Sequence, residues 1–108
     1  MLDDLVRDTL ALCAIPAPTF AEGARAAAVA ALLREAGLEP TSDATGNVLA
    51  RIGPPGPAIV VAAHIDTVFP AGTPLEPRRE HGRLHGPGIG DNCVAVATLV
   101  ELATELSA

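Results

Sequence analysis

The chain has 108 residues, which is enough for one small domain and not for two. Its seven basic residues are all arginine and face thirteen acidic residues, for a net charge of −6. No basic cluster is larger than the pair Arg78-Arg79, so the electrostatic footprint of a nucleic-acid-binding protein is missing. No purely apolar run in the sequence is long enough to span a bilayer. We therefore expect neither nucleic acid nor a membrane as a partner.

The N-terminus and the cysteines indicate a compartment. The opening residues, Met1 to Asp4, carry acidic charge where a secretory signal needs positive charge. Cys13 and Cys93 form neither a CxxC pair nor a disulfide framework. We therefore expect a reduced, cytoplasmic protein.

Two helices are expected in the first third of the chain. The first begins at the acidic N-terminal pair, either member of which can cap it, and it ends before Pro16. Thr19 and Glu22 have the spacing of a capping box, in which a hydroxyl and a carboxylate satisfy free amides at the start of the next helix. That helix runs to about residue 36, where Gly37 occupies the position of a left-handed C-cap.

The periodicity changes after residue 38. Residues 47–52 and 58–64 are predicted to be strands, separated by a turn rich in glycine and proline. The second is apolar on both faces, as expected of an interior strand covered by helices on both sides. Residues 70–90 are predicted to be mostly loop with a short hairpin through 78–84, and a third helix begins near Asp91. This order predicts an α/β fold, a layered sheet with flanking helices.

The third helix has only one narrow polar stripe, formed by Thr98, Glu101 and Glu105. A helix that is apolar around most of its circumference needs covering layers. We therefore expect the chain to be the N-terminal piece of a longer polypeptide, with apolar surface left exposed along this helix.

The end of the second predicted strand carries chemically useful side chains. His64 and Asp66 stand two residues apart, so in an extended chain both point to the same face. Open α/β folds place their ligands at this edge of the sheet. A metal-ligating histidine needs its second ring nitrogen held by an acceptor, and Asp66 is placed to be that acceptor. The alternative is a solvated strand end with an incidental histidine and aspartate.

A glycine-rich loop precedes the third helix. Gly86, Gly88 and Gly90 alternate with other residues, and Asp91 follows at the start of the helix. A phosphate cradle is one interpretation, but no Lys-Ser or Lys-Thr follows the glycines and an acid there would repel a phosphate. A carboxylate at a glycine-lined turn suits a cation better. The alternative is that Asp91 only caps the helix.

Taken together and in order, four segments resemble the dinuclear zinc hydrolases of metallopeptidase family M20. That family includes peptidase T, carboxypeptidase G, acetylornithine deacetylase and aminoacylase. The matching segments are Ile15-Pro16-Ala17-Pro18-Thr19 through Glu22, Asp43 through Val48, His64 through Val68, and Gly86 through Asn92. They cover nearly the whole chain. The chain departs from the family at Cys93-Val94-Ala95, where members commonly have Lys-Gly or Arg-Gly.

The resemblance implies roles for the candidate site residues. His64 would ligate one metal ion, Asp66 would serve in catalysis by orienting that imidazole, and Asp91 would bridge two divalent metal ions, with zinc expected. The peptide Asp91–Asn92 would be cis, as it often is in the family. Further ligands and the general base would lie beyond residue 108.

The resemblance also implies an activity. Residues 1–108 would be the N-terminal portion of the catalytic domain of a co-catalytic zinc hydrolase, inactive alone. The full-length protein would be a homodimer that hydrolyses a peptide or related amide bond in a zinc-dependent reaction. The alternatives are an N-acyl amino acid deacylase, or a non-catalytic binding domain of the same fold.

Overall fold

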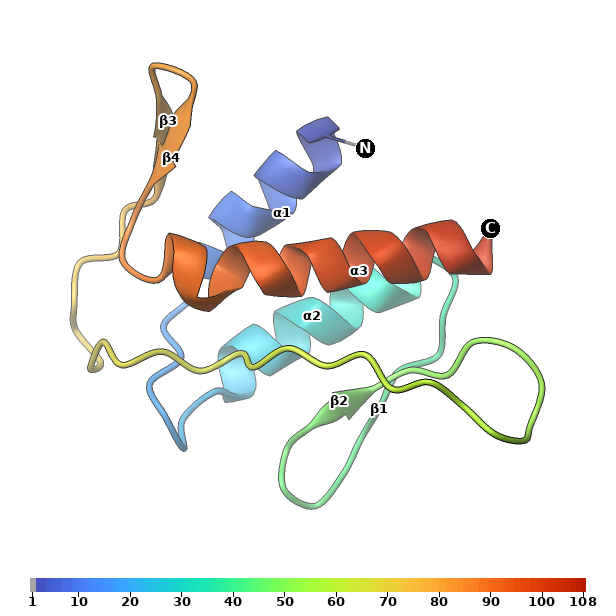
Figure 1. Cartoon of the computed structure of the whole chain (residues 1–108). Coiled ribbons are helices and arrows are strands. Elements are labelled where there is room, and N and C mark those ends of the chain that lie inside the picture. Colours follow the sequence, from blue (N-terminus) through green and yellow to red (C-terminus); the bar gives the residue numbers. More distant parts are fainter. Residues whose placement is uncertain (1) are drawn as a thin grey trace.

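A computed structural model describes residues 2–108, and within them it contains three α-helices and two small antiparallel ribbons (Figure 1). The helices are α1 (Leu2–Cys13), α2 (Gly23–Glu35) and α3 (Val94–Ser107). One ribbon pairs β1 (Thr41–Ser42) with β2 (Val48–Leu49), and the other pairs β3 (Arg78–Glu80) with β4 (Arg83–His85). A wide helical turn, Ile89–Cys93, leads directly into α3. The chain is thus a small mixed α/β domain.

The hydrophobic core lies where the three helices meet. Its buried residues come from each helix in turn: Leu12 from α1, Val29 and Leu33 from α2, and Val96, Ala97, Val100 and Ala103 from α3. Removing these apolar side chains from water is the main force that holds the helices together. The core is therefore helical, and neither ribbon contributes a fully buried residue to it.

The predicted helix ends are only partly confirmed. Gly37 closes α2 with a φ of +87°, the left-handed conformation expected of a C-cap. The predicted capping box is wrong, because no side chain among residues 2–108 accepts a hydrogen bond from the first amides of α2, and the Thr19 hydroxyl instead donates to the Asp66 carboxylate at 2.6 Å. The Glu22 carboxylate accepts from the backbone N–H of Phe20 at 2.9 Å. The Thr19 hydroxyl thus takes part in a tertiary contact with Asp66 and not in a local contact at the start of α2.

The predicted strand over residues 58–64 does not form. In the part of the chain that the structure describes, residues 58–63 make no backbone hydrogen bond, although they are extended. Ile59 is 93% exposed and Val60 is 86% exposed. A strand exists only when a neighbour pairs with it, and β2, the strand formed within the predicted residues 47–52, pairs with β1 instead. The expected layered sheet is therefore not found among residues 2–108.

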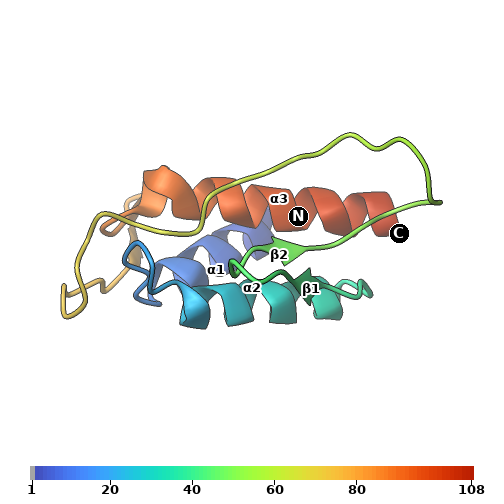
Figure 2. The same ribbon diagram turned by 90° about the horizontal axis from the view of Figure 1, so that it is seen from below.

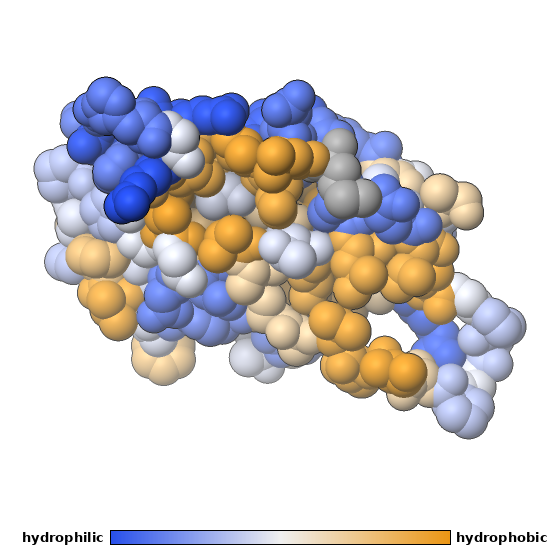
Figure 3. All heavy atoms as spheres, turned by 45° about the horizontal axis from the view of Figure 1, so that its top comes forward, coloured by the Kyte–Doolittle hydropathy of each residue, from blue (hydrophilic) through white to orange (hydrophobic). Residues whose placement is uncertain are grey.

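The extended segment 58–63 runs along α3 (Figures 1 and 2). Val61, Ala62 and Ala63 line a shallow apolar hollow whose other wall is formed by α3. Apolar side chains remain open to solvent on α3, where Leu102 is 41% exposed and Leu106 is 62% exposed. Figure 3 shows apolar side chains gathered in patches on the surface of the molecule. The predicted exposure along the third helix is thus confirmed.

Two smaller findings complete the fold. The predicted hairpin is confirmed as β3 and β4, with His81 and Gly82 at its tip, both at positive φ. No helix within residues 2–108 is long and apolar enough to cross a membrane.

Candidate functional site

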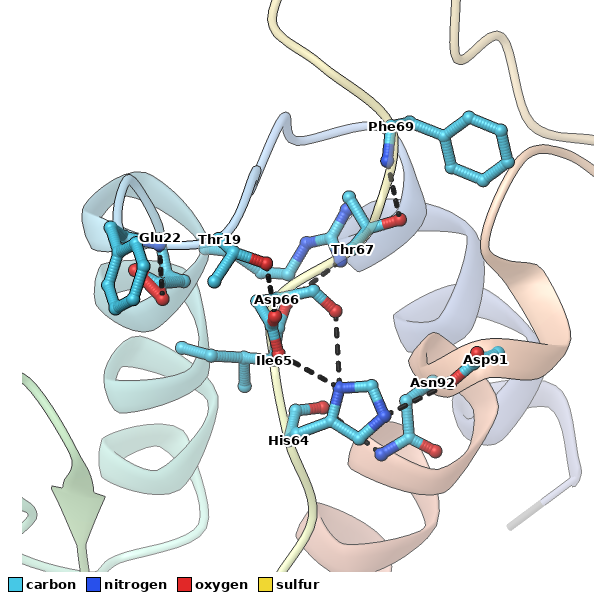
Figure 4. Close-up of polar contacts among 11 residues, drawn as sticks. Thr19, Glu22, His64, Ile65, Asp66, Thr67, Phe69, Asp91 and Asn92 are labelled. Carbon is cyan, nitrogen blue, oxygen red and sulfur yellow. Dashed lines mark hydrogen bonds and ion pairs between the residues drawn. The ribbon is translucent and has the colours of Figure 1, made fainter.

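The site is centred on His64 and Asp91, which are 27 residues apart in the sequence. His64 lies at the end of the extended segment beside α3, and Asp91 lies in the wide turn that precedes this helix. The Nε2 atom of His64 is 3.0 Å from the Oδ1 atom of Asp91 (Figure 4). The two residues thus lie as close together as ligands of one metal site would require, although His64 follows an extended coil and not a strand.

Asp66 holds the other side of the imidazole. Its Oδ1 atom lies 3.1 Å from His64 Nδ1, and its backbone carbonyl oxygen lies 3.2 Å from the same nitrogen. The second carboxylate oxygen accepts the Thr19 hydroxyl at 2.6 Å. Both ring nitrogens of His64 thus face acceptors, one from each aspartate (Figure 4).

These contacts lower the pKa of Asp66 and raise the pKa of His64. The hydrogen bond from Thr19 is the largest cause that lowers the pKa of Asp66, and it outweighs partial desolvation with the help of His64. Desolvation alone would lower the pKa of His64, but hydrogen bonds to Asp66 and Asp91 and the charge of Asp66 raise it above its ordinary value. The negative surroundings therefore favour positive charge at the imidazole position, whether from a proton or from a cation.

The turn that carries Asp91 has an unusual backbone. The peptide between Asp91 and Asn92 is cis, as the resemblance implied, and neither residue has helical dihedral angles. The Asn92 side-chain amide donates to the backbone carbonyl of His64 at 3.1 Å, which ties the turn to the extended segment. The Asp91 carboxylate makes no capping bond to the helix and its side chain is 85% exposed. Asp91 is therefore directed to the site and does not act as a helix cap.

Gly88 directly precedes this turn and has a φ of +81°, which residues with a side chain rarely adopt. A Cβ atom at this position would lie 3.3 Å from the Thr67 hydroxyl oxygen and 3.4 Å from the carbonyl oxygen of Asp91. The turn therefore depends on glycine here both for its conformation and for close packing against the segment that follows His64.

The donor atoms fit part of a divalent metal site. Imidazole nitrogen and carboxylate oxygen are both zinc ligands, and the separation of His64 Nε2 and Asp91 Oδ1 allows one cation to contact both. Asp66 on the remaining ring nitrogen matches the usual outer partner of a ligating histidine. Within residues 2–108, no three side chains of histidine, cysteine, aspartate or glutamate converge to hold a metal. These residues thus bring two donor side chains together and place a carboxylate on the other ring nitrogen of His64.

The sequence was also compared with those of known proteins. The sequence model of peptidase family M20/M25/M40 matches residues 60–108. The chain is 38% identical to succinyl-diaminopimelate desuccinylase of Methylobacterium sp. (strain 4-46), over 82% of this chain and 27% of that protein. It is 34% identical to the protein of the same name from Methylobacterium nodulans, over 88% of this chain and 29% of that protein. Together these matches support a place for the chain in peptidase family M20/M25/M40.

The chain spans a little over a quarter of the length of the curated relatives it matches. The region matched by the family model contains His64, Asp66 and Asp91. The segment from Ile15 to Arg25, which supports these residues through hydrogen bonds, lies outside that region. The family model therefore covers the polar centre of the site but not its support.

Arg25 is the supporting residue that sequence reasoning missed. Its side chain is 2% exposed, and it donates to the carbonyl of Ile15 at 2.6 and 3.1 Å and to the carbonyl of Ile65 at 3.0 Å. We call these hydrogen bonds from Arg25 to the carbonyls of Ile15 and Ile65 the Arg25 clamp. The same two segments are also joined by the N–H of Thr67, which donates to the carbonyl of Ala17 at 2.8 Å. The only available signal was an isolated arginine within the alanine-rich face of a helix.

Proposed function

We propose that this chain is the N-terminal portion of the catalytic domain of a metal-dependent hydrolase that cleaves an amide bond. The single observation that carries the proposal is the 3.0 Å approach of His64 Nε2 to Asp91 Oδ1, with Asp66 on the opposite ring nitrogen. Family membership supports hydrolysis as the reaction class. The layered sheet expected from the sequence would then be completed by residues outside this chain.

Each residue has a defined task in this proposal. His64 and Asp91 would hold divalent metal ions, zinc being our choice, with Asp91 shared between them. When bound, such ions would supply Lewis acidity for the hydrolysis of an amide. Asp66 keeps the proton of the imidazole on Nδ1, so that the Nε2 lone pair remains available to the metal. The general base and the remaining ligands would come from residues outside this chain.

For the substrate we favour an N-acyl amino acid. The two relatives described above are both named as desuccinylases, and a succinyl group removed from an amine is an acyl group leaving an amide. A peptide is the second candidate, favoured by the description of the family as peptidases. A homodimer and a cytoplasmic location complete the proposal. The two free thiols, Cys13 and Cys93, fit a reducing compartment.

The activity is tested on the full-length protein. The purified enzyme is assayed with an N-succinyl amino acid and with a dipeptide, before and after treatment with a chelator and after zinc is restored. We expect hydrolysis of the succinyl amide to disappear with the chelator and to return with zinc. Full activity in the metal-free enzyme would refute the proposal, and cleavage of the dipeptide alone would transfer it to the peptidase class.

The metal site is tested on the present chain by titration calorimetry with zinc. The variants are His64→Gln, Asp91→Asn and, as a matched control, His81→Gln on the exposed hairpin tip. We expect weak binding of zinc to the wild-type chain, loss of that binding in the first two variants, and no change in the control. Equal loss in all three variants would show that zinc binds to histidine without regard to the site.

A further inference from the structure

The Thr19 hydroxyl has a partner that its sequence position did not predict. It donates to Asp66 Oδ2 at 2.6 Å, across 47 residues of sequence. The other oxygen of the same carboxylate, Oδ1, faces His64 Nδ1 at 3.1 Å. The carboxylate is therefore held on both sides, which fixes its rotation about the bond to Cβ (Figure 4).

The backbone that carries Thr19 is itself anchored to the site. Pro18 and Thr67 form a parallel bridge, and the Thr67 N–H donates to the carbonyl of Ala17. The buried Arg25 guanidinium joins the same two segments through the carbonyls of Ile15 and Ile65. The backbone around Thr19 is thus fixed to the backbone around Asp66 by several hydrogen bonds, which hold the Thr19 hydroxyl beside the carboxylate.

We propose that Thr19 is a positioning residue that sets the tautomer of His64 through Asp66. His64 has acceptors on both sides, so its single proton in the neutral ring has two competing places. A carboxylate held by Thr19 presents Oδ1 to Nδ1 beside the backbone carbonyl oxygen of Asp66, and the two acceptors together retain the proton there. The Nε2 lone pair then faces Asp91, the arrangement that a cation shared by these two residues requires. The importance for metal binding rests on the proposed function, whereas the tautomer does not.

The test compares Thr19→Val, which removes the hydroxyl, with Thr19→Ser, which keeps it. Nitrogen-15 NMR of the metal-free chain at about pH 9, where the ring is neutral, reports which ring nitrogen of His64 carries the proton. We expect Nδ1–H in the wild type, a mixture of the two tautomers in Thr19→Val, and recovery of the wild-type spectrum in Thr19→Ser. Thr41→Val, in the remote strand β1, is the matched control and should leave the spectrum unchanged.

Zinc titration of the same variants gives a second readout. Removing the outer partner of a ligating histidine lowers metal affinity about 10–100-fold. Thr19 acts one step further out, so we expect about a three- to tenfold loss in Thr19→Val. Failure of the wild-type chain to bind zinc would count against the proposed function, while the NMR comparison would still decide the role of Thr19. A Thr19→Val spectrum identical to that of the wild type, or a Thr19→Ser spectrum like that of Thr19→Val, would overturn the inference.

Discussion

Replacing Arg25 with methionine should destabilise the chain more than any surface substitution. The guanidinium is buried and satisfies the carbonyls of Ile15 and Ile65, both of which lie in half-buried backbone. A buried acceptor left without a partner costs about 1–3 kcal/mol. Methionine has a similar length and removes the cost of burying a charge, so the lower half of that range applies to each carbonyl. We therefore expect a loss of about 2–4 kcal/mol in the free energy of unfolding.

The assay is urea unfolding followed by far-UV circular dichroism. With a slope of about 2 kcal/mol per molar urea, the expected loss lowers the midpoint by about 1–2 M. Arg34→Met, at the exposed end of the same helix, is the control and should stay within about 0.5 kcal/mol of the wild type. Arg25→Lys should fall between them, because an ammonium group lacks the planar fork of donors that serves two carbonyls. Equal urea midpoints for Arg25→Met and Arg34→Met would show that the hydrogen bonds of Arg25 to these carbonyls do not stabilise the chain.

Three further predictions concern other features of the fold. Gly88→Ala should lower the free energy of unfolding by about 2 kcal/mol, whereas Gly72→Ala, at positive φ but with open space around it, should cost about 1 kcal/mol. Hydrogen bonds within its own turn lower the pKa of Asp43, so the stability they contribute should be present at neutral pH and lost as the pH falls through the folded-state pKa. Burial, aided by the neighbouring Cys93, raises the pKa of Cys13 to about 11. Both thiols are buried, so neither should react with a disulfide reagent before the chain unfolds.

The controls for these predictions are simple. Gly23→Ala, at the start of α2 and without positive φ, should be neutral or slightly stabilising, and a loss as large as that of Gly88→Ala would contradict the argument from close packing. The melting temperature of Asp43→Ala should fall less between pH 5 and pH 2 than that of the wild type. An equal fall in both proteins would show that Asp43 does not contribute to the pH dependence of stability. Thiol labelling faster than unfolding would show that Cys13 or Cys93 is accessible in the native chain.

Parts of the site could be read from the sequence because they depend on residue type and close spacing. His64 and Asp66 interact across one intervening residue, as their spacing predicted. The glycine-lined turn and its acid were also recognisable, and the structure brings that acid to His64. The roles of all three residues as ligands or orienting groups stay predictions until metal is measured. Thr19 was misassigned because its spacing to Glu22 satisfies a local rule, while its actual partner lies far along the chain.

The amino-acid sequence by itself determined the three helices, the C-cap at Gly37 and the hairpin tip at His81-Gly82, since each follows from backbone preferences within a few residues. Only the tertiary structure decided that Arg25 is buried, that Thr19 serves Asp66, and that the apolar segment 58–63 lies unpaired beside α3. Strand formation and polar pairing are properties of two segments at once. A residue's own neighbours in the sequence cannot specify which distant backbone will supply the partner.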